Sequence, residues 1–138
     1  GFVLNIHYTF SKDFFTRDNL QQLFLSLEWE SGKDADLLYE AIMNSHTVVS
    51  AWDGDRLVGL ANALSDGALT AYFHYVLTMP QYQGRGIGRE LMTRILERYK
   101  HYQTKVLISY PKAQTFYERL GFEAESDSVP MYLMSRKK

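Results

Sequence analysis

A glycine-rich hexapeptide near the middle of the 138-residue chain decides which fold the sequence favours. It reads Gln83-Gly84-Arg85-Gly86-Ile87-Gly88. Residues 69–79 before it alternate as in a long strand that Pro80 ends, and apolar side chains recur at helical spacing after it. The hexapeptide therefore joins a strand to an amphipathic helix. Glycines in such a turn let backbone N–H groups converge at the positive end of the helix dipole, which favours a phosphate or pyrophosphate.

The N-terminal part of the chain predicts one strand and two helices. Alternating apolar residues indicate a strand over residues 5–10. Thr16 or Asp18 is a suitable N-cap for the first helix, and Asp34 for the second. Residues 28–33 break the helical pattern between them.

Three strands are expected next, as an antiparallel meander. They cover residues 46–52, 56–64 and 69–79. Asp53-Gly54 and Asp66-Gly67 lie between them, and Asp-Gly pairs are strong hairpin signals.

The C-terminal third predicts a parallel strand, a short helix and two final strands. The strand at 105–109 follows a helix, so it is expected to lie parallel to the strand before that helix. A helix over 113–120 would end at Gly121, and strands are expected at 122–124 and 129–134. The element order is then β-α-α-β-β-β-α-β-α-β-β. It predicts one α/β layered domain over residues 1–138, with a mixed, mostly antiparallel sheet.

Composition excludes several classes of function. The chain has no cysteine, which rules out disulfide bonds, thiolate metal sites and a cysteine nucleophile. The four histidines show no metal-ligand spacing, so no metal is expected. A net charge of −1 argues against a nucleic-acid partner. No apolar run approaches about 18 residues, so no membrane span is expected. The expected setting is cytoplasmic, and a homodimer is left open.

Other phosphate-binding motifs do not fit the glycine turn. A P-loop needs Gly-Lys-Ser/Thr, which is absent. A dinucleotide fingerprint needs different glycine spacing and an acidic residue about 20 positions on, which is also absent. The alternative to a phosphate site is a turn that only connects the strand to the helix and carries solvated arginines.

Two motifs resemble the GNAT superfamily of N-acetyltransferases. The stretch 79–88 is similar to the acetyl-CoA signature of that superfamily, and Phe116-Tyr117 upstream of Gly121-Phe122 resembles its second hallmark. The predicted element order also matches. Many members carry Asn where this chain has Tyr110.

The resemblance implies acetyl-CoA as co-substrate, with no metal. The pantetheine arm would pair with the strand before the turn, at Val76, Leu77 and Thr78. The pyrophosphate would lie on the turn and the helix start. The residues implied there are Gln83, Gly84, Arg85, Gly86, Ile87, Gly88 and Arg89.

Two residues are candidates for proton transfer. The resemblance implies that Tyr117 protonates the leaving thiolate, and its phenol pKa near 10 suits that role; the alternative is a core aromatic. His74 titrates near neutrality and is the candidate base or water relay, with a structural histidine as the alternative.

The resemblance implies an acceptor site at the loop that joins the first two helices, and one face of the long strand is expected to border it. Tyr72 and His74 belong to the more polar strand face, whereas Tyr75 falls in the set expected to face the core, unless a bulge shifts the phase. Glu28, Trp29 and Glu30 would draw in a cation. A solvated loop is the alternative for the two glutamates.

The sequence therefore predicts an N-acetyltransferase that moves an acetyl group from acetyl-CoA to a primary amine of a small molecule or peptide. Direct attack in a ternary complex is expected, because no cysteine can hold the acetyl group. The alternative is a non-catalytic acyl-CoA-binding sensor domain on the same fold.

Overall fold

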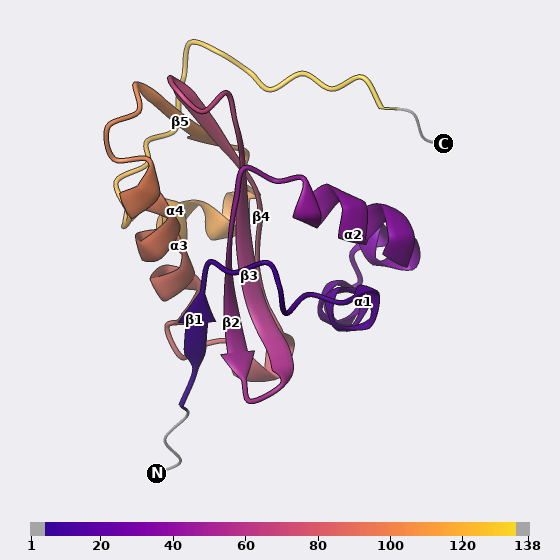
Figure 1. Cartoon of the computed structure of the whole chain (residues 1–138). Coiled ribbons are helices and arrows are strands. Elements are labelled where there is room, and N and C mark those ends of the chain that lie inside the picture. The colour runs from indigo at the N-terminus through magenta and orange to yellow at the C-terminus, as the bar shows by residue number, and fades with distance from the viewer. Residues whose placement is uncertain (1–4, 135–138) are drawn as a thin grey trace. The chain divides into compact units, whose positions relative to one another are not determined.

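The computed structural model describes residues 5–134, which divide after Leu107 into two compact units. The first unit contains one five-stranded sheet of order β1-β2-β3-β4-β5 (Figure 1). Its strands are β1 (His7–Thr9), β2 (Thr47–Asp53), β3 (Arg56–Ser65), β4 (Thr70–Thr78) and β5 (Thr104–Leu107). All neighbours are antiparallel except β4 and β5, which are parallel as predicted.

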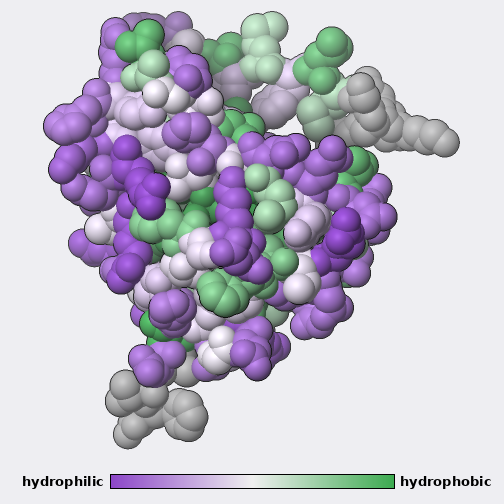
Figure 2. Space-filling view, viewed as in Figure 1, coloured by the Kyte–Doolittle hydropathy of each residue, from purple (hydrophilic) through white to green (hydrophobic). Residues whose placement is uncertain are grey.

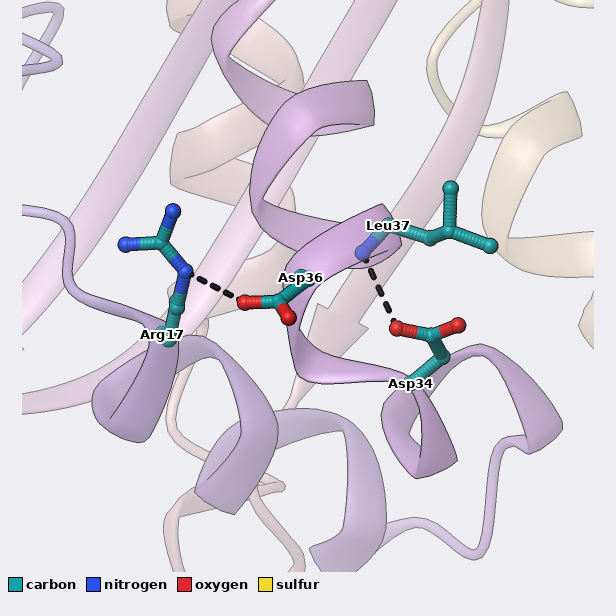
Figure 3. A network of polar contacts seen from close by, with 4 residues as sticks. All are labelled: Arg17, Asp34, Asp36 and Leu37. Carbon is teal, nitrogen blue, oxygen red and sulfur yellow. Dashed lines mark hydrogen bonds and ion pairs between the residues drawn. The ribbon is translucent and has the colours of Figure 1, made fainter.

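Helices α1 (Arg17–Ser26) and α2 (Ala35–Met43) begin where their caps predict. Thr16 accepts from the Asn19 N–H and closes a capping box, so Thr16 and not Asp18 starts α1. Asp34 accepts from the Leu37 N–H at 3.1 Å (Figure 3). The Arg17 guanidinium lies 2.6 Å from the Asp36 carboxylate, a contact also drawn in Figure 3, and it joins the starts of the two helices at the surface.

Helix α3 (Ile87–Arg98) packs against small residues of β3. A Cβ built on Gly59 would come within 3.1 Å of Ile87 and Leu91. Ala61 and Ala63 are fully buried two and four positions further along the strand. Because side chains alternate along a strand, these three small residues lie on the same face and allow α3 to approach the sheet closely.

Helices α1 and α2 lie on the other side of the sheet from α3, as Figure 1 shows. Ring contacts agree with this view. Phe24 of α1 meets Tyr75 of β4 at 4.9 Å between centroids, whereas Tyr99 at the end of α3 meets Phe73 of β4 at 5.7 Å. The long strand β4 is therefore covered from both sides.

The second unit contains the 3-10 turn η3 (Pro111–Ala113) and helix α4 (Gln114–Glu118). Gly121 has φ +101° after α4, in keeping with its predicted role as a C-terminal cap. The strands predicted at 122–124 and 129–134 are wrong, because no strand forms between residues 108 and 134.

The failed prediction has a simple cause. A strand needs a neighbour for its N–H and C=O groups, and the described part of this unit supplies none. Val129, Met131 and Leu133 alternate correctly for a strand yet are exposed. Figure 2 shows hydrophobic side chains along this segment toward the C-terminus.

Candidate active site

The glycine turn has the backbone geometry that its sequence predicts. Strand β4 is followed by the 3-10 turn η2 (Pro80–Tyr82) and then by two glycines in left-handed conformation, Gly84 at φ +79° and Gly86 at φ +82°. A Cβ at either position would meet nothing within 4 Å. Glycine is therefore required there by backbone conformation, and the space in front of the turn is open.

The turn leaves donors at the start of α3. Gly86 is the N-cap, and no side chain there caps the helix. The N–H groups of Ile87, Gly88 and Arg89 belong to the first helical turn, where intrahelical acceptors do not exist. They lie at the positive end of the helix dipole, so an anion is stabilised there.

Tyr82 fixes the entrance to the turn, a feature that the sequence analysis missed. Its side chain is 8% exposed and its hydroxyl donates to the Asp53 carboxylate at the β2–β3 hairpin. That hydrogen bond raises the pKa of the Tyr82 phenol. The Arg56 and Arg85 guanidinium groups lie 5.7 and 5.8 Å from its ring centroid. The hairpin thereby holds the segment that leads into the glycines.

Strand β4 separates from β5 after its first half. The parallel pairing joins Thr70–Phe73 to Thr104–Leu107 and goes no further within the described residues. The Tyr75 N–H points toward β3, where Asn62 accepts it at 2.7 Å. Because N–H directions alternate along a strand, the backbone groups of Val76 and Thr78 point to the opposite edge. Gln83 donates to the Thr78 carbonyl at 3.0 Å, which ties this edge to the turn.

A bulge in β4 changes which side chains share a face. The β3–β4 register shifts between Ala61 and Ala63, so that Asn62 opposes both His74 and Tyr75. Side chains after the bulge reverse their direction. The spacing of Tyr75 predicted that it faces the core with Phe73, and this prediction is wrong. Tyr75 is half-buried and lies on the α1 side of the sheet.

His74 and its neighbours form the titratable part of this face. The His74 ring is exposed, and its Nδ1 atom lies 3.0 Å from the Tyr72 hydroxyl. Neighbouring side chains still remove part of the water around the ring, and this desolvation lowers the pKa of His74 below its usual 6.5. The imidazole is consequently neutral at pH 7 and able to accept a proton.

Aromatic rings continue from His74 toward the loop after α1. The ring centroids of His74 and Tyr75 are 4.3 Å apart, and those of Tyr75 and Trp29 are 5.4 Å apart. The Tyr75 hydroxyl lies 2.7 Å from the Ser31 hydroxyl. We call Tyr72, His74, Tyr75 and Trp29 the aromatic row.

The two glutamates beside the aromatic row are in solvent. Glu28 is exposed and has φ +59°, and the exposed Glu30 pairs with Lys33 at 3.1 Å. These observations match the solvated-loop alternative. The exposed Glu28 carboxylate still attracts a cation at long range, although salt screens it, whereas Lys33 offsets the charge of Glu30.

Tyr117 lies in the second unit. Its ring meets Phe116 at 5.0 Å and Phe122 at 6.0 Å, both edge to face. Burial raises the pKa of its phenol above 10, so that the group is protonated at neutral pH.

Comparison with known proteins identifies the class of this fold and site. A sequence profile described as "Acetyltransferase (GNAT) domain" matches residues 19–131. The uncharacterized N-acetyltransferase ycf52 of Gracilaria tenuistipitata var. liui is 30% identical over 135 residues, and its counterpart in Prochlorococcus marinus is 33% identical over 112. These matches cover 94% and 77% of this chain, and 73% and 62% of the two relatives.

Solved structures agree. A GNAT-family acetyltransferase from Streptococcus pneumoniae superposes with a TM-score of 0.80 at 26% identity, covering 98% of this chain and 100% of that one. A Staphylococcus aureus protein shares the fold with a TM-score of 0.82 at 24% identity, covering 94% and 99%. The fold is thus that of an acetyltransferase. The chain belongs to the GNAT family of N-acetyltransferases.

The structure and the comparisons bear on two expectations, the absence of a membrane span and the cytoplasmic location. None of the helices within residues 5–134 is both long and apolar enough to cross a membrane. One relative, 33% identical over 76 residues that cover 54% of this chain and 30% of that protein, is the chloroplastic GCN5-related N-acetyltransferase 2 of Arabidopsis thaliana. The cytoplasmic setting therefore stays a prediction.

Proposed function

We propose that this chain transfers the acetyl group of acetyl-CoA to a primary amine, of a small molecule or a peptide, by direct attack in a ternary complex. The observation that supports the proposal most is the open edge of β4 leading into the glycine turn. An extended arm with amide groups pairs with such an edge as another strand would. A pyrophosphate at the end of the arm then meets the uncapped N–H groups of α3.

The proposed chemistry needs two proton movements. The amine nitrogen bonds to the thioester carbonyl carbon while the carbon–sulfur bond breaks. The neutral amine loses one proton and the departing thiolate gains one. His74, directly or through water, is the proposed acceptor, because its lowered pKa keeps it neutral. Tyr117 is the proposed donor, because its raised pKa keeps the phenol protonated.

The aromatic row supports an amine with an apolar body. Aromatic rings attract a cation through their faces and bury aromatic or aliphatic groups at the same time. Partial desolvation there lowers the pKa of the bound ammonium, which increases the reactive neutral form. The exposed Glu28 carboxylate disfavours an acidic or phosphorylated acceptor.

A thiol-release assay tests the proposal. The chain has no cysteine, so a thiol reagent detects only the CoA that is set free. Acetyl-CoA is incubated with the protein and a panel of arylalkyl amines, polyamines and peptides, and mass spectrometry identifies the acetylated product. Amine-dependent release is expected. Tight binding of acetyl-CoA with no release above the protein-free rate for any amine would instead indicate an acyl-CoA sensor.

A further inference from the structure

The bulge in β4 is held by one buried side chain outside the aromatic row. Asn62 on β3 is 2% exposed. Its Oδ1 atom accepts from the Tyr75 N–H at 2.7 Å, and its Nδ2 group donates to the Ser45 hydroxyl at 3.0 Å. The Ser45 hydroxyl in turn donates to the Ala41 carbonyl of α2 at 2.9 Å. A continuous polar chain thus runs from the end of α2 through β3 to the bulge.

The physical need for this amide follows from the register. Asn62 opposes two residues of β4, so the ladder of backbone hydrogen bonds is interrupted at the bulge. The Tyr75 N–H would then have no ladder acceptor on β3, and an unpaired buried N–H is costly. The side chain of Asn62 supplies the missing carbonyl oxygen.

The bulge has consequences for the candidate site. It places Tyr75 beside His74 on the α1 side, where an unbroken strand would turn Tyr75 toward α3. Pairing between β4 and β5 ends at Phe73, one residue before the bulge. The bulge therefore lies where the aromatic row is completed and the open edge begins.

We propose that Asn62 is a positioning residue of the acetyltransferase: its buried carboxamide holds the bulge and so presents His74 and Tyr75 to the acceptor amine. This inference rests on the proposed function. Leu at position 62 would fill the space of Asn but lacks the acceptor. Asp retains an oxygen at the same place. Ser45 offers a matched control, because it belongs to the same series of hydrogen bonds but does not contact Tyr75.

The test compares Asn62→Leu, Asn62→Asp and Ser45→Ala. In Asn62→Leu we expect exchange of the Tyr75 amide hydrogen, followed by NMR, to accelerate at least tenfold relative to the amides of Leu60 and Leu77. Ser45→Ala removes the donor to Ala41 and leaves the Tyr75 contact. In this variant the exchange rate of the Tyr75 amide, relative to the amides of Leu60 and Leu77, is expected to stay within threefold of its value in the parent. Asn62→Asp is expected to behave like Ser45→Ala.

Kinetics test the functional half of the proposal. In Asn62→Leu, kcat/KM for the best amine is expected to fall at least tenfold and to lose the pH-dependent rise that His74 provides. Adding His74→Ala to Asn62→Leu is expected to cost no more than another twofold, since both changes disable the same group. If Ser45→Ala lowered kcat/KM as much as Asn62→Leu does, Asn62 would have only a role in stability, and the proposal would be overturned.

Two further outcomes are decisive. Tyr75 exchange unchanged in Asn62→Leu refutes the bulge role even if the enzyme is active. If no amine is acetylated by the parent, the proposed function fails, while the exchange experiment still decides whether Asn62 holds the bulge. Should Asn62→Leu not fold, Asn62→Ala removes the acceptor without added bulk and takes its place in both measurements.

Discussion

Replacing Gly86 by Ala separates backbone strain from ligand binding at the glycine turn. The φ of +82° is left-handed, and an alanine there costs about 1–2 kcal/mol. No atom lies within 4 Å of the added Cβ, so no steric clash adds to this cost. The Tm is expected to fall by roughly 3–8 °C.

Gly67 offers a closely matched control. It has φ +78°, and an added Cβ would meet only the His46 ring at 3.6 Å, an ordinary contact. Gly67→Ala should therefore lower the Tm by a similar amount, in a loop between β3 and β4 that is outside the candidate site.

Only the Gly86 variant is expected to lose ligand affinity. Acetyl-CoA binding must restore the left-handed conformation, so each 1.4 kcal/mol of strain that the ligand-free turn relieves by changing conformation weakens binding about tenfold and lessens the fall in Tm correspondingly. Isothermal titration calorimetry measures both variants and the parent. An affinity within twofold of the parent for Gly86→Ala, or an equal loss for Gly67→Ala, would refute the assignment of the pyrophosphate to this turn.

Three further predictions concern the chemistry. Tyr117→Phe is expected to lower kcat roughly 100-fold in the thiol-release assay with the Tm little changed, because the ring remains and only the proton donor is lost. The parent kcat/KM should rise with pH around a midpoint below 6.5, because the pKa of His74 is lowered and its neutral form is the base. His74→Ala should remove this rise but keep a second rise at higher pH, which comes from deprotonation of the amine substrate. In competition assays, plain arylalkyl amines or polyamines should have higher kcat/KM than carboxylated or phosphorylated analogues, because the exposed Glu28 carboxylate repels anions.

Each of these predictions has a plain contrary result. A kcat within twofold of the parent for Tyr117→Phe would show that water or another group protonates the thiolate. Identical pH profiles in parent and His74→Ala would remove His74 from the mechanism. A preference for acidic amines would contradict the acceptor site itself.

Local signals predicted most of the first unit. Thr16 and Asp34 start their helices, and the turn at Gly84 and Gly86 adopts positive φ, because each depends on neighbours a few residues away. The strand at 129–134 failed for the opposite reason: its alternation is local, but a strand also requires a partner, which sequence periodicity does not reveal.

The candidate site was only partly predictable for the same physical reason. His74 and Trp29 could be chosen by chemistry and position. Asn62 could not, because its role depends on a register shift between two strands. The Tyr82–Asp53 contact likewise joins residues 29 positions apart. A buried Asn in an otherwise apolar strand is the one signal that would have pointed to the bulge.

Backbone amide NMR of the full chain during titration with acetyl-CoA tests most directly whether acetyl-CoA lies along the open edge of β4 with its pyrophosphate on the glycine turn. We expect the largest shifts at the N–H groups of Val76 and Thr78 and of residues 84–89, with little change at the β1–β2 edge of the sheet. Saturable binding that leaves residues 84–89 unchanged and shifts amides elsewhere would contradict it.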